Sequence, residues 1–483
     1  MTAHVGVPRV AIVGGGFTGT AIAVHLAKHA TTPLAVTIFE PRPSVGGGVA
    51  YSSTDAAHRT NVAAARMSLF SDDESHFVRW LTATGALIDD PDACLPDGRI
   101  YPRRQVFGAY VAAQLQGASA AGIAAVRHLQ DSAVTIFRHG PEWRVTSAAG
   151  RVVAADIVVL AVSHPPPGVP PRLIAAFGNL PGFVPDPWAQ GALDRIAPQD
   201  DVVVMGTALS MADIVASLDR RGHRGRIVAF SRRGRISQPH ATHTHATFGD
   251  FAEPPPTTAL DLLIRLRRAF ADASAAGQPW QAVIDAARRD GQAVWQALDS
   301  RQRRTLLRHL RSYWEVHRYR VAPQVGAVIE RRRREGTLEI LAADLGNVVG
   351  RDTTLRFELL LRGRGVAIGG TRWVDAQAFV VTTGPAHGNI LTSNPALRSL
   401  ADAGLVQRDE YGLGLLVDRQ HRAVSRSATA ADTLLIAGPL ARGTFGELMG
   451  LPQVSRDAEV VAAEILKRLN VAGDANPLLR AAS

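Results

Sequence analysis

The chain has 483 residues, 46% of them hydrophobic and 20% charged, which predicts a globular protein of two or three domains. A single cysteine, Cys94, excludes an intramolecular disulfide and a C-x-x-C redox pair, and having only two lysines, Lys28 and Lys467, argues against Schiff-base chemistry. The net charge of +10 comes from scattered arginines without a nucleic-acid-binding motif, and no leader or apolar run of about 20 residues is found. We therefore expect a cytoplasmic protein with a small-molecule substrate and no nucleic-acid or membrane partner.

The first predicted unit is a strand, a glycine turn and a helix. Residues 10–13 form a short apolar run, the turn reads G-x-G-x-x-G, and residues 20–27 continue at helical spacing. Such glycines allow a tight turn, close approach of backbone N–H groups to a pyrophosphate, and close packing of the helix on the strand. The predicted pyrophosphate contacts are Gly14, Gly16, Phe17, Thr18 and Gly19.

An acidic residue ends the next predicted strand, residues 34–39. Glu40, followed by Pro41, lies where a carboxylate binds the ribose hydroxyls of a dinucleotide. A carboxylate at this position argues for an adenosine without a 2′-phosphate. The first unit therefore predicts a site for FAD.

A second unit begins after a proline-rich stretch at residues 164–171. Strands are predicted at residues 201–205 and 226–230. Arg232 and Arg233 follow the second strand, where guanidinium groups can bind the 2′-phosphate of NADPH through forked hydrogen bonds. This unit predicts NADPH as the reductant, with NADH as the alternative. The residues of its degenerate glycine turn are Gly206, Thr207, Ala208 and Ser210.

Three histidines follow in a proline- and threonine-rich loop: His240, His243 and His245. Metal ligands need rigid support, so we predict no metal site there and assign His240 to face the substrate or the nicotinamide. From about residue 257 to 320 the apolar spacing is helical, which predicts an insert that caps the cleft between the domains. One helix face of this insert is predicted to hold Trp280, Val283, Ile284, Ala287, Val294, Trp295 and Leu298.

Further along, four consecutive arginines at residues 331–334 predict a solvated helix end. Apolar strands at residues 156–162 and 378–384 are predicted to return to their respective sheets, and Gly384 ends the second. A last buried strand ends in Gly438 and precedes a helix from about residue 452 to 469, whose N-terminus is expected at the flavin.

The predicted fold class is α/β, with two Rossmann-like dinucleotide-binding domains, the second inserted in the first, and a helical insert. The FAD-binding domain is expected to comprise residues 1–165 and 386–470. Residues 166–385 form the predicted NAD(P)-binding domain, with the insert at about 250–322, and residues 471–483 form a C-terminal tail. The oligomeric state stays open, with a homodimer as one option.

Together these motifs resemble bacterial FAD/NAD(P)-binding oxidoreductases with two dinucleotide-binding domains and, more distantly, class B flavin monooxygenases. Residues 39–48 are similar to the family's acid-then-glycine segment, which implies flavin contacts from Gly47 and Gly48. Residues 58–61 are similar to the segment in which class B members place an asparagine near the isoalloxazine. The resemblance implies Asn61 as a catalytic and flavin-contacting residue, and it adds Met67 and Ser68 to the flavin side.

Two departures from the family bear on the reaction. Residues 180–188 lack the histidine of the Baeyer–Villiger signature, and Pro439 follows Gly438 where many flavoproteins carry an aspartate. The asparagine segment favours an FAD-dependent NAD(P)H oxidoreductase that is a class-B-like flavin monooxygenase, acting on a nitrogen or sulfur of a small molecule, and this is the function we expect. The missing histidine favours the alternative, an NAD(P)H-dependent reductase, dehydrogenase or oxidase without oxygen insertion. A flavin-bearing, redox-responsive binding protein is a third alternative.

Overall fold

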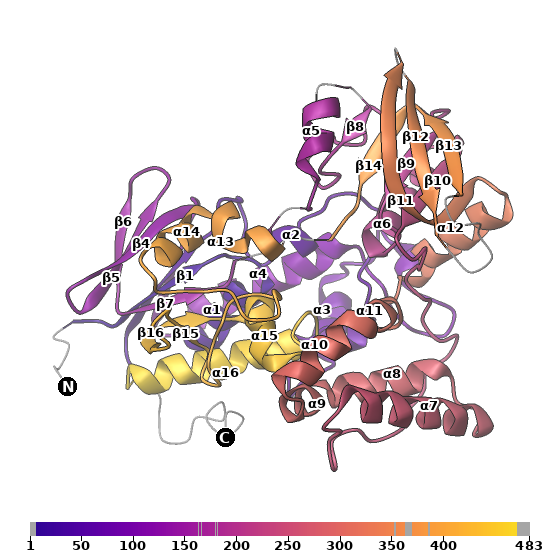
Figure 1. The fold of residues 1–483 in the computed structure, drawn as a ribbon. Helices are drawn as coiled ribbons and strands as arrows, with labels where there is room; N and C mark the ends of the chain where they lie inside the picture. The colour runs from indigo at the N-terminus through magenta and orange to yellow at the C-terminus, as the bar shows by residue number, and fades with distance from the viewer. Residues whose placement is uncertain are drawn as a thin grey trace.

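The computed structural model describes residues 6–162, 164–165, 167–178, 180, 182–351, 354–362, 370–384 and 387–470. The predicted tail, residues 471–483, lies outside the described residues. Two large sheets, a small three-stranded sheet and a group of helices make up the molecule (Figure 1). Within the described part of the chain, no helix combines the length and the apolar character needed to cross a bilayer.

The first sheet has the strand order β15-β16-β7-β1-β2-β3. The strand β1 pairs in parallel with β2 and with β7, and β7 pairs in parallel with β16. Because β16 follows the whole second sheet in the sequence, the chain returns to its first sheet, as predicted. The bounds are β1 Arg9–Val13, β2 Leu34–Phe39, β3 Ala124–Leu129, β7 Ile157–Leu160, β15 Arg422–Val424 and β16 Ala430–Ile436.

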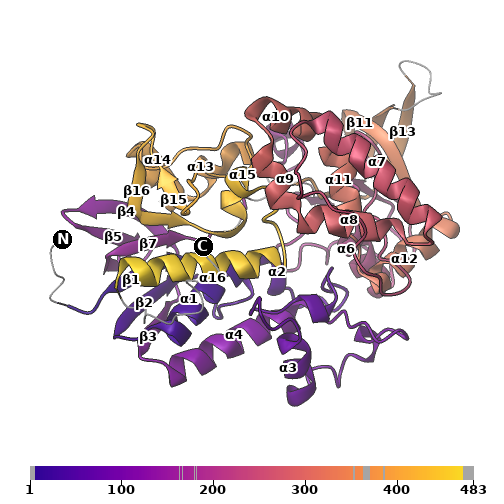
Figure 2. The same cartoon turned by 90° about the horizontal axis from the view of Figure 1, so that it is seen from below.

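Helices cover this sheet, and α1 lies between the neighbouring helices α4 and α16 (Figure 2). Small and apolar residues fill α1, so that it is buried from Phe17 to Ala27 and packs closely on both neighbours. The bounds are α1 Phe17–His29, α2 Gly48–Tyr51, α3 His76–Thr84, α4 Arg104–Ala121, α13 Ile390–Ser393, α14 Pro395–Asp402, α15 Arg442–Phe445 and α16 Gln453–Arg468.

Sequence analysis did not predict the small antiparallel sheet, β4-β5-β6. Its strands are β4 Ala133–His139, β5 Glu142–Ser147 and β6 Val152–Ala155. The helix α14 packs against β4, and the Ser399 hydroxyl accepts a hydrogen bond from the Ile136 amide at 3.0 Å. This sheet extends the first domain on the side away from the second large sheet (Figure 1).

The second large sheet has the order β13-β12-β11-β10-β9-β14-β8, and its centre repeats the plan of the first. The strand β9 pairs in parallel with β10 and with the returning strand β14, as predicted. The antiparallel run β11-β12-β13 was not predicted. Its bounds are β8 Phe183–Val184, β9 Val202–Met205, β10 Ile227–Ser231, β11 Leu338–Arg351, β12 Thr354–Leu361, β13 Thr371–Ala376 and β14 Ala378–Val381, with helices α5 Pro171–Phe177, α6 Leu209–Arg220 and α12 Pro323–Arg334.

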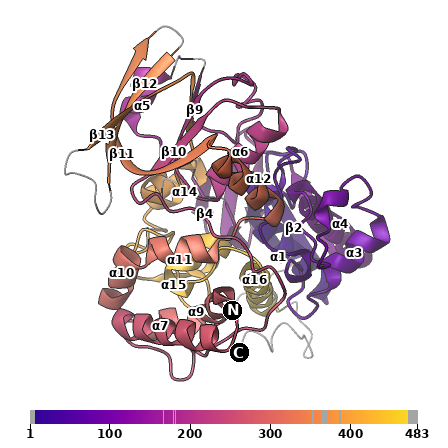
Figure 3. The same cartoon turned by 90° about the vertical axis from the view of Figure 1, so that its right-hand side faces the viewer.

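The helical insert forms its own layer beside the second sheet (Figure 3). The predicted single helix face from Trp280 to Leu298 is wrong in one respect, because the helix ends at Arg289 and a second begins at Gly291. Both helices still contribute to one core through Val283 and Val294. The helices of the insert are α7 Ala259–Ala275, α8 Trp280–Arg289, α9 Gly291–Ala297, α10 Ser300–His309 and α11 Arg311–Arg318.

The arginine run at the end of α12 is not uniformly solvated, so that prediction is wrong for Arg332. This side chain is only 2% exposed and donates hydrogen bonds to the carbonyl oxygens of Gly225 at 2.8 Å and His223 at 3.3 Å. Burying a guanidinium requires such acceptors, and the loop before β10 supplies them. Arg332 therefore fastens α12 to the second sheet.

We propose that the domain boundaries follow the two sheets, with residues 6–165 and 387–470 in the first domain and residues 167–384 in the second. The insert belongs to the second domain by sequence, since it lies between β10 and β11.

Candidate active site

The first glycine turn joins β1 to α1 and suits a pyrophosphate. A Cβ atom added at Gly19 would lie 2.0 Å from the carbonyl oxygen of Gly14, so no side chain fits there. Gly16 is the N-cap of α1, and no described side chain caps the N–H groups of the first turn. These N–H groups, the helix dipole and the hydroxyl of Thr18 at the same end fit a phosphate ligand. Phe17, the first residue of α1, is buried against Phe107.

Glu40 lies at the end of β2, where the sequence predicts contact with a ribose. Its carboxylate accepts hydrogen bonds from the Gly15 amide at 3.1 Å and from the Arg42 guanidinium at 2.9 Å. The side chain is 3% exposed and faces the glycine turn, while Pro41 begins the loop that follows. An acid at this position fits the adenosine end of FAD.

Segments far apart in the sequence meet at the N-terminus of α1. The Gly46 amide donates to the Gly15 carbonyl at 2.8 Å, and Gly48 lies so close that an added Cβ would be 2.9 Å from the Cα of Gly16. Gly438 has a φ of +67°, and a Cβ there would lie 2.6 Å from the Thr18 hydroxyl. The structure therefore brings three glycine segments predicted to contact FAD to one end of one helix. Gly47 is the N-cap of α2 in the same loop.

Met67 and Ser68 are adjacent buried residues, and Ser68 contacts the first turn of α16. The Ser68 carbonyl accepts a hydrogen bond from the Ser455 hydroxyl at 2.7 Å, and both Met67 and Ser68 are buried. The start of α16 thus lies next to a segment that the family resemblance assigns to the flavin.

The second turn, between β9 and α6, repeats the geometry of the first. Gly206 has a φ of +126°, and an added Cβ would lie 2.5 Å from the Thr382 hydroxyl. Ala208 is the N-cap of α6, and no described side chain caps that turn. The Thr207 hydroxyl bonds to the Ser231 hydroxyl at 2.8 Å and fixes the turn to the end of β10. Ser210 lies in the first turn of α6.

Two arginines follow β10, as the sequence indicates. Arg232 is exposed, while the Arg233 guanidinium donates to the Ser312 hydroxyl of the insert. Gly384 is also exposed, and its carbonyl accepts a hydrogen bond from the Gly168 amide at 3.2 Å. No described heavy atom would lie within 4 Å of a Cβ at residue 384, so packing does not require glycine there. Because the Arg233 guanidinium is held by Ser312, Arg232 is the better candidate to bind a 2′-phosphate.

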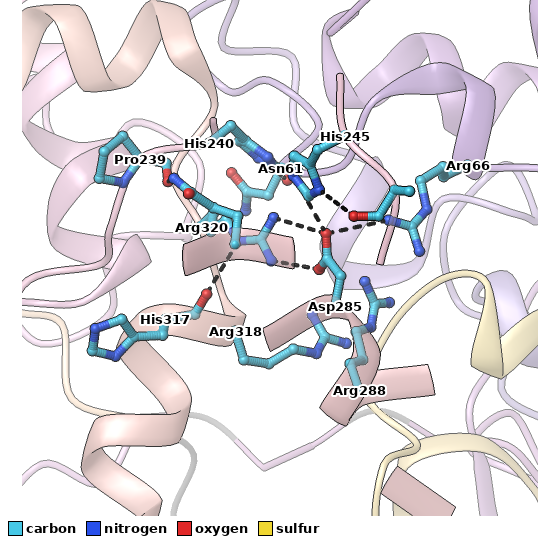
Figure 4. Close-up of polar contacts among 12 residues, drawn as sticks. Asn61, Arg66, Pro239, His240, His245, Asp285, Arg288, His317, Arg318 and Arg320 are labelled. Atoms are coloured by element: carbon cyan, nitrogen blue, oxygen red, sulfur yellow. Dashed lines mark hydrogen bonds and ion pairs between the residues drawn. The ribbon is translucent and has the colours of Figure 1, made fainter. Parts of the chain in front are cut away.

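The two predicted catalytic residues contact each other at the junction of the two domains (Figure 4). The His240 Nε2 atom lies 2.9 Å from the Asn61 carbonyl oxygen, so that Nε2 carries the proton and donates it. The ring of His240 also packs against Tyr101, with 5.2 Å between ring centroids. Burial, and next to it the positive charge of Arg320, lower the pKa of His240 to about 4. His240 is therefore neutral at neutral pH and positions Asn61 through its backbone.

This low pKa predicts how protein stability changes at acidic pH in a His240→Gln variant. The glutamine amide can keep the hydrogen bond to the Asn61 carbonyl. Unfolded His240 takes up a proton below pH 6.5, whereas folded His240 takes it up only near pH 4. Between these values protonation favours unfolding, so wild type should lose stability relative to the variant by about 1.4 kcal/mol per pH unit as the pH falls. Urea unfolding at several pH values measures this difference. A difference that stays constant from pH 7 to pH 4 would contradict the assignment.

A charged cluster around the buried pair Asp285 and Arg320 lies directly beside this contact (Figure 4). Both carboxylate oxygens of Asp285, on α8, contact the Arg320 guanidinium, the longer bond measuring 3.3 Å. Arg66 from the first domain lies 3.7 Å from the same carboxylate, and His245 lies 4.0 Å from it. Arg320 holds the pKa of Asp285 below its usual value despite the burial.

Neither Asp285 nor Arg320 was among the site residues predicted from the sequence. The available signals were an acid between the apolar residues Ile284 and Ala286 of α8, and the polar, aromatic segment at residues 313–323 that closes the insert. Neither signal gives a pairing partner. The cluster joins α8 of the insert, the loop after α11 and the first domain, so it holds these three segments together at the domain junction.

Comparisons with known proteins agree with this architecture. Residues 11–165 match a family described as FAD-NAD(P)-binding. Comparison with curated protein sequences gives no match. The chain is similar to the solved structure of reduced ornithine hydroxylase from Pseudomonas aeruginosa, with 15% identity, a TM-score of 0.63, and coverage of 96% of this chain and 100% of that chain.

Two further structures share this fold. L-lysine 6-monooxygenase from Pseudomonas syringae is 18% identical, with a TM-score of 0.59 and coverage of 96% and 99%. The FAD-bound cadaverine monooxygenase from Erwinia amylovora is 12% identical, with a TM-score of 0.57 and coverage of 96% and 95%. The chain thus carries a FAD-NAD(P)-binding segment in its first unit and has the fold of these three solved structures.

Proposed function

We propose that this protein is an FAD-dependent NADPH oxidoreductase, a flavin monooxygenase that hydroxylates a nitrogen of a small molecule. The fold it shares with ornithine, lysine and cadaverine monooxygenases supports the choice of nitrogen. The observation that carries the proposal is the contact between Asn61 of the first domain and His240 of the second. It joins, at the domain junction, the two residues assigned to the reaction.

When bound, FAD accepts hydride from NADPH and activates oxygen. In this proposal the first glycine turn binds the FAD pyrophosphate, and the turn at Gly206 binds that of NADPH. Arg232 binds the 2′-phosphate. His240 fixes the Asn61 backbone, and its bond uses the carbonyl rather than the side-chain amide, which is therefore assigned to the flavin or the substrate. His240 is a positioning residue here, since its low pKa keeps it from donating a catalytic proton at neutral pH.

The test measures where the electrons of NADPH go. Protein reconstituted with FAD is supplied with NADPH, oxygen and a panel of primary amines, and NADPH loss, hydrogen peroxide and hydroxylamine product are quantified together. We expect one amine class to give nearly one hydroxylamine per NADPH. Peroxide equal to the NADPH consumed, or electron transfer to an organic acceptor alone, would replace the proposal by an oxidase or a reductase. Reduction without turnover, together with salt-sensitive nucleic-acid binding, would favour the redox-responsive binding protein.

Arg232→Ala tests the assignment of the second unit to NADPH. Loss of a charge-assisted hydrogen bond costs about 1.5–3 kcal/mol, so the concentration of NADPH for half-maximal flavin reduction should rise about ten- to a hundredfold. The value for NADH should stay unchanged, because NADH lacks the 2′-phosphate. Rapid-mixing reduction with each nucleotide gives both values. Arg127→Ala, at an exposed position on β3, is the matched control, and equal losses for NADPH and NADH would refute the role of Arg232.

A further inference from the structure

A cavity of about 500 Å³ lies between the helical insert and the segment 442–449 of the first domain. This volume falls within the range of small-molecule sites, about 300–1,000 Å³. The helix α15 contacts α9 of the insert at this place, as Figure 2 shows. Most of the lining is apolar and includes Leu262, Leu266, Phe270, Leu306, Leu310 and Trp314.

One wall of the cavity carries a buried arginine, Arg442. It is 7% exposed, and its Nε atom is buried without a hydrogen-bond partner. No described carboxylate pairs with it directly: Glu315 pairs with Arg311 at 2.7 Å, Asp409 accepts bonds from the amides of Tyr411 and Leu413, and both act on Arg442 only through space. Among the residues that the structure describes, Arg442 has no ion pair. A buried guanidinium without an anion is strongly unfavourable, so this arginine calls for an anionic partner.

The remaining acid of the cavity cannot supply that partner. Glu447 accepts a hydrogen bond from Arg318 at 2.6 Å and lies 3.8 Å from Arg288. Arg267 lines the cavity as well, but its side chain is exposed. The cavity therefore combines apolar walls with one buried guanidinium that no described carboxylate pairs with directly.

We propose that this cavity binds a small molecule with an apolar body and one carboxylate, and that the carboxylate pairs with the guanidinium of Arg442. A planar guanidinium binds a carboxylate through two parallel hydrogen bonds, and the leucine and aromatic side chains bury the body. The segment that carries Arg442 begins at Gly438, next to Thr18 at the first glycine turn, and leads into α16. None of the residues assigned to FAD, NADPH or catalysis lines this cavity, so the ligand class is assigned from the cavity alone and not as the substrate of the proposed reaction.

Calorimetry on the FAD-loaded protein, without NADPH, tests the site with decanoate and its neutral analogue 1-decanol. We expect decanoate to bind more tightly than 1-decanol. Arg442→Gln should weaken decanoate about ten- to a hundredfold and leave 1-decanol unchanged, because only the charged hydrogen bonds are lost. The control Arg267→Gln, at an exposed arginine of the same cavity, should change decanoate affinity less than threefold. Equal binding of the two ligands, or an unchanged decanoate affinity in Arg442→Gln, would overturn the inference.

Leu266→Trp provides a second variant in which Arg442 is intact. The indole fills the cavity, so this variant should weaken decanoate and 1-decanol together, and unaltered binding of both would show that they bind elsewhere and overturn the inference. The readout is also separate from the proposed reaction. Failure of decanoate to bind a protein that still hydroxylates amines overturns only the carboxylate site, whereas decanoate binding by a protein that never oxidises NADPH overturns only the proposed function.

Discussion

Replacing Gly19 by alanine should yield a protein that is purified without its yellow flavin. The new Cβ would lie 2.0 Å from the Gly14 carbonyl oxygen, well inside van der Waals contact, so the turn and the first residues of α1 must move apart. The N–H groups of this turn are the proposed pyrophosphate site, so FAD affinity should fall at least about a hundredfold, the loss of two or more charge-assisted hydrogen bonds. Visible absorbance of the purified protein and FAD titration measure the effect.

A matched substitution controls for glycine replacement as such. Gly117 lies within α4, and no described heavy atom would come within 4 Å of a Cβ added there. Gly117→Ala should therefore keep its FAD and gain about 0.5–1 kcal/mol in unfolding free energy, because alanine restricts the unfolded chain. Circular dichroism shows whether Gly19→Ala still folds. A folded Gly19→Ala protein that binds FAD normally would refute the assignment of the first turn.

The second large effect is expected at Asp285, in the charged cluster of the domain junction. Asp285→Asn keeps the shape of the side chain but removes the charge that compensates Arg320, and both side chains are less than 10% exposed. Breaking a buried pair in this way costs about 3–5 kcal/mol, because the remaining ion stays desolvated. The urea midpoint of unfolding, followed by tryptophan fluorescence, should fall accordingly.

An exposed ion pair provides the comparison. Glu335 pairs with Arg331 at 3.2 Å on the surface of α12, where water screens both charges. Glu335→Gln should cost less than about 1 kcal/mol. Combining Asp285→Asn with Arg320→Met should recover much of the lost stability, since no unpaired ion remains. Similar small costs for Asp285→Asn and Glu335→Gln would show that the cluster is solvated in solution.

The sequence predicts the two dinucleotide units well because local chemistry determines them. Gly19 is required by a backbone contact within its own turn, whereas Gly14 and Gly206 have positive φ angles, which favour glycine. Short apolar runs such as β1 and β9 have a buried environment on both faces. These signals lie within a few residues of each other. They indicate both nucleotide-binding units and the return of the chain to the first sheet, but not the order of the strands in either sheet.

What the sequence did not predict depends on contacts between distant segments. Asp285 and Arg320 are 35 positions apart, and neither shows its partner in the local pattern. In the sequence, nothing distinguishes Arg332 from the neighbouring arginines, because its burial depends on the distant loop before β10. Asn61 and His240 were each identified, but their bond runs through a backbone carbonyl, which residue type does not reveal. The strands β11–β13 alternate polar and apolar residues around a bulge between Leu345 and Val348, which weakens their periodic signal.

The late position of β16 and α16 has a consequence for biosynthesis. Strands β1, β2 and β7 leave the ribosome long before the chain that completes their sheet, and the whole second sheet is translated in between. Domains generally fold as units during translation, in the order of their synthesis. Here the inserted second domain can fold first. Until β16 is synthesised, the N-terminal part of the first domain has an incomplete sheet with β7 as an edge strand that lacks its partner β16. Nascent chains arrested before residue 430 should therefore already protect the second sheet from protease and leave the first one cleavable.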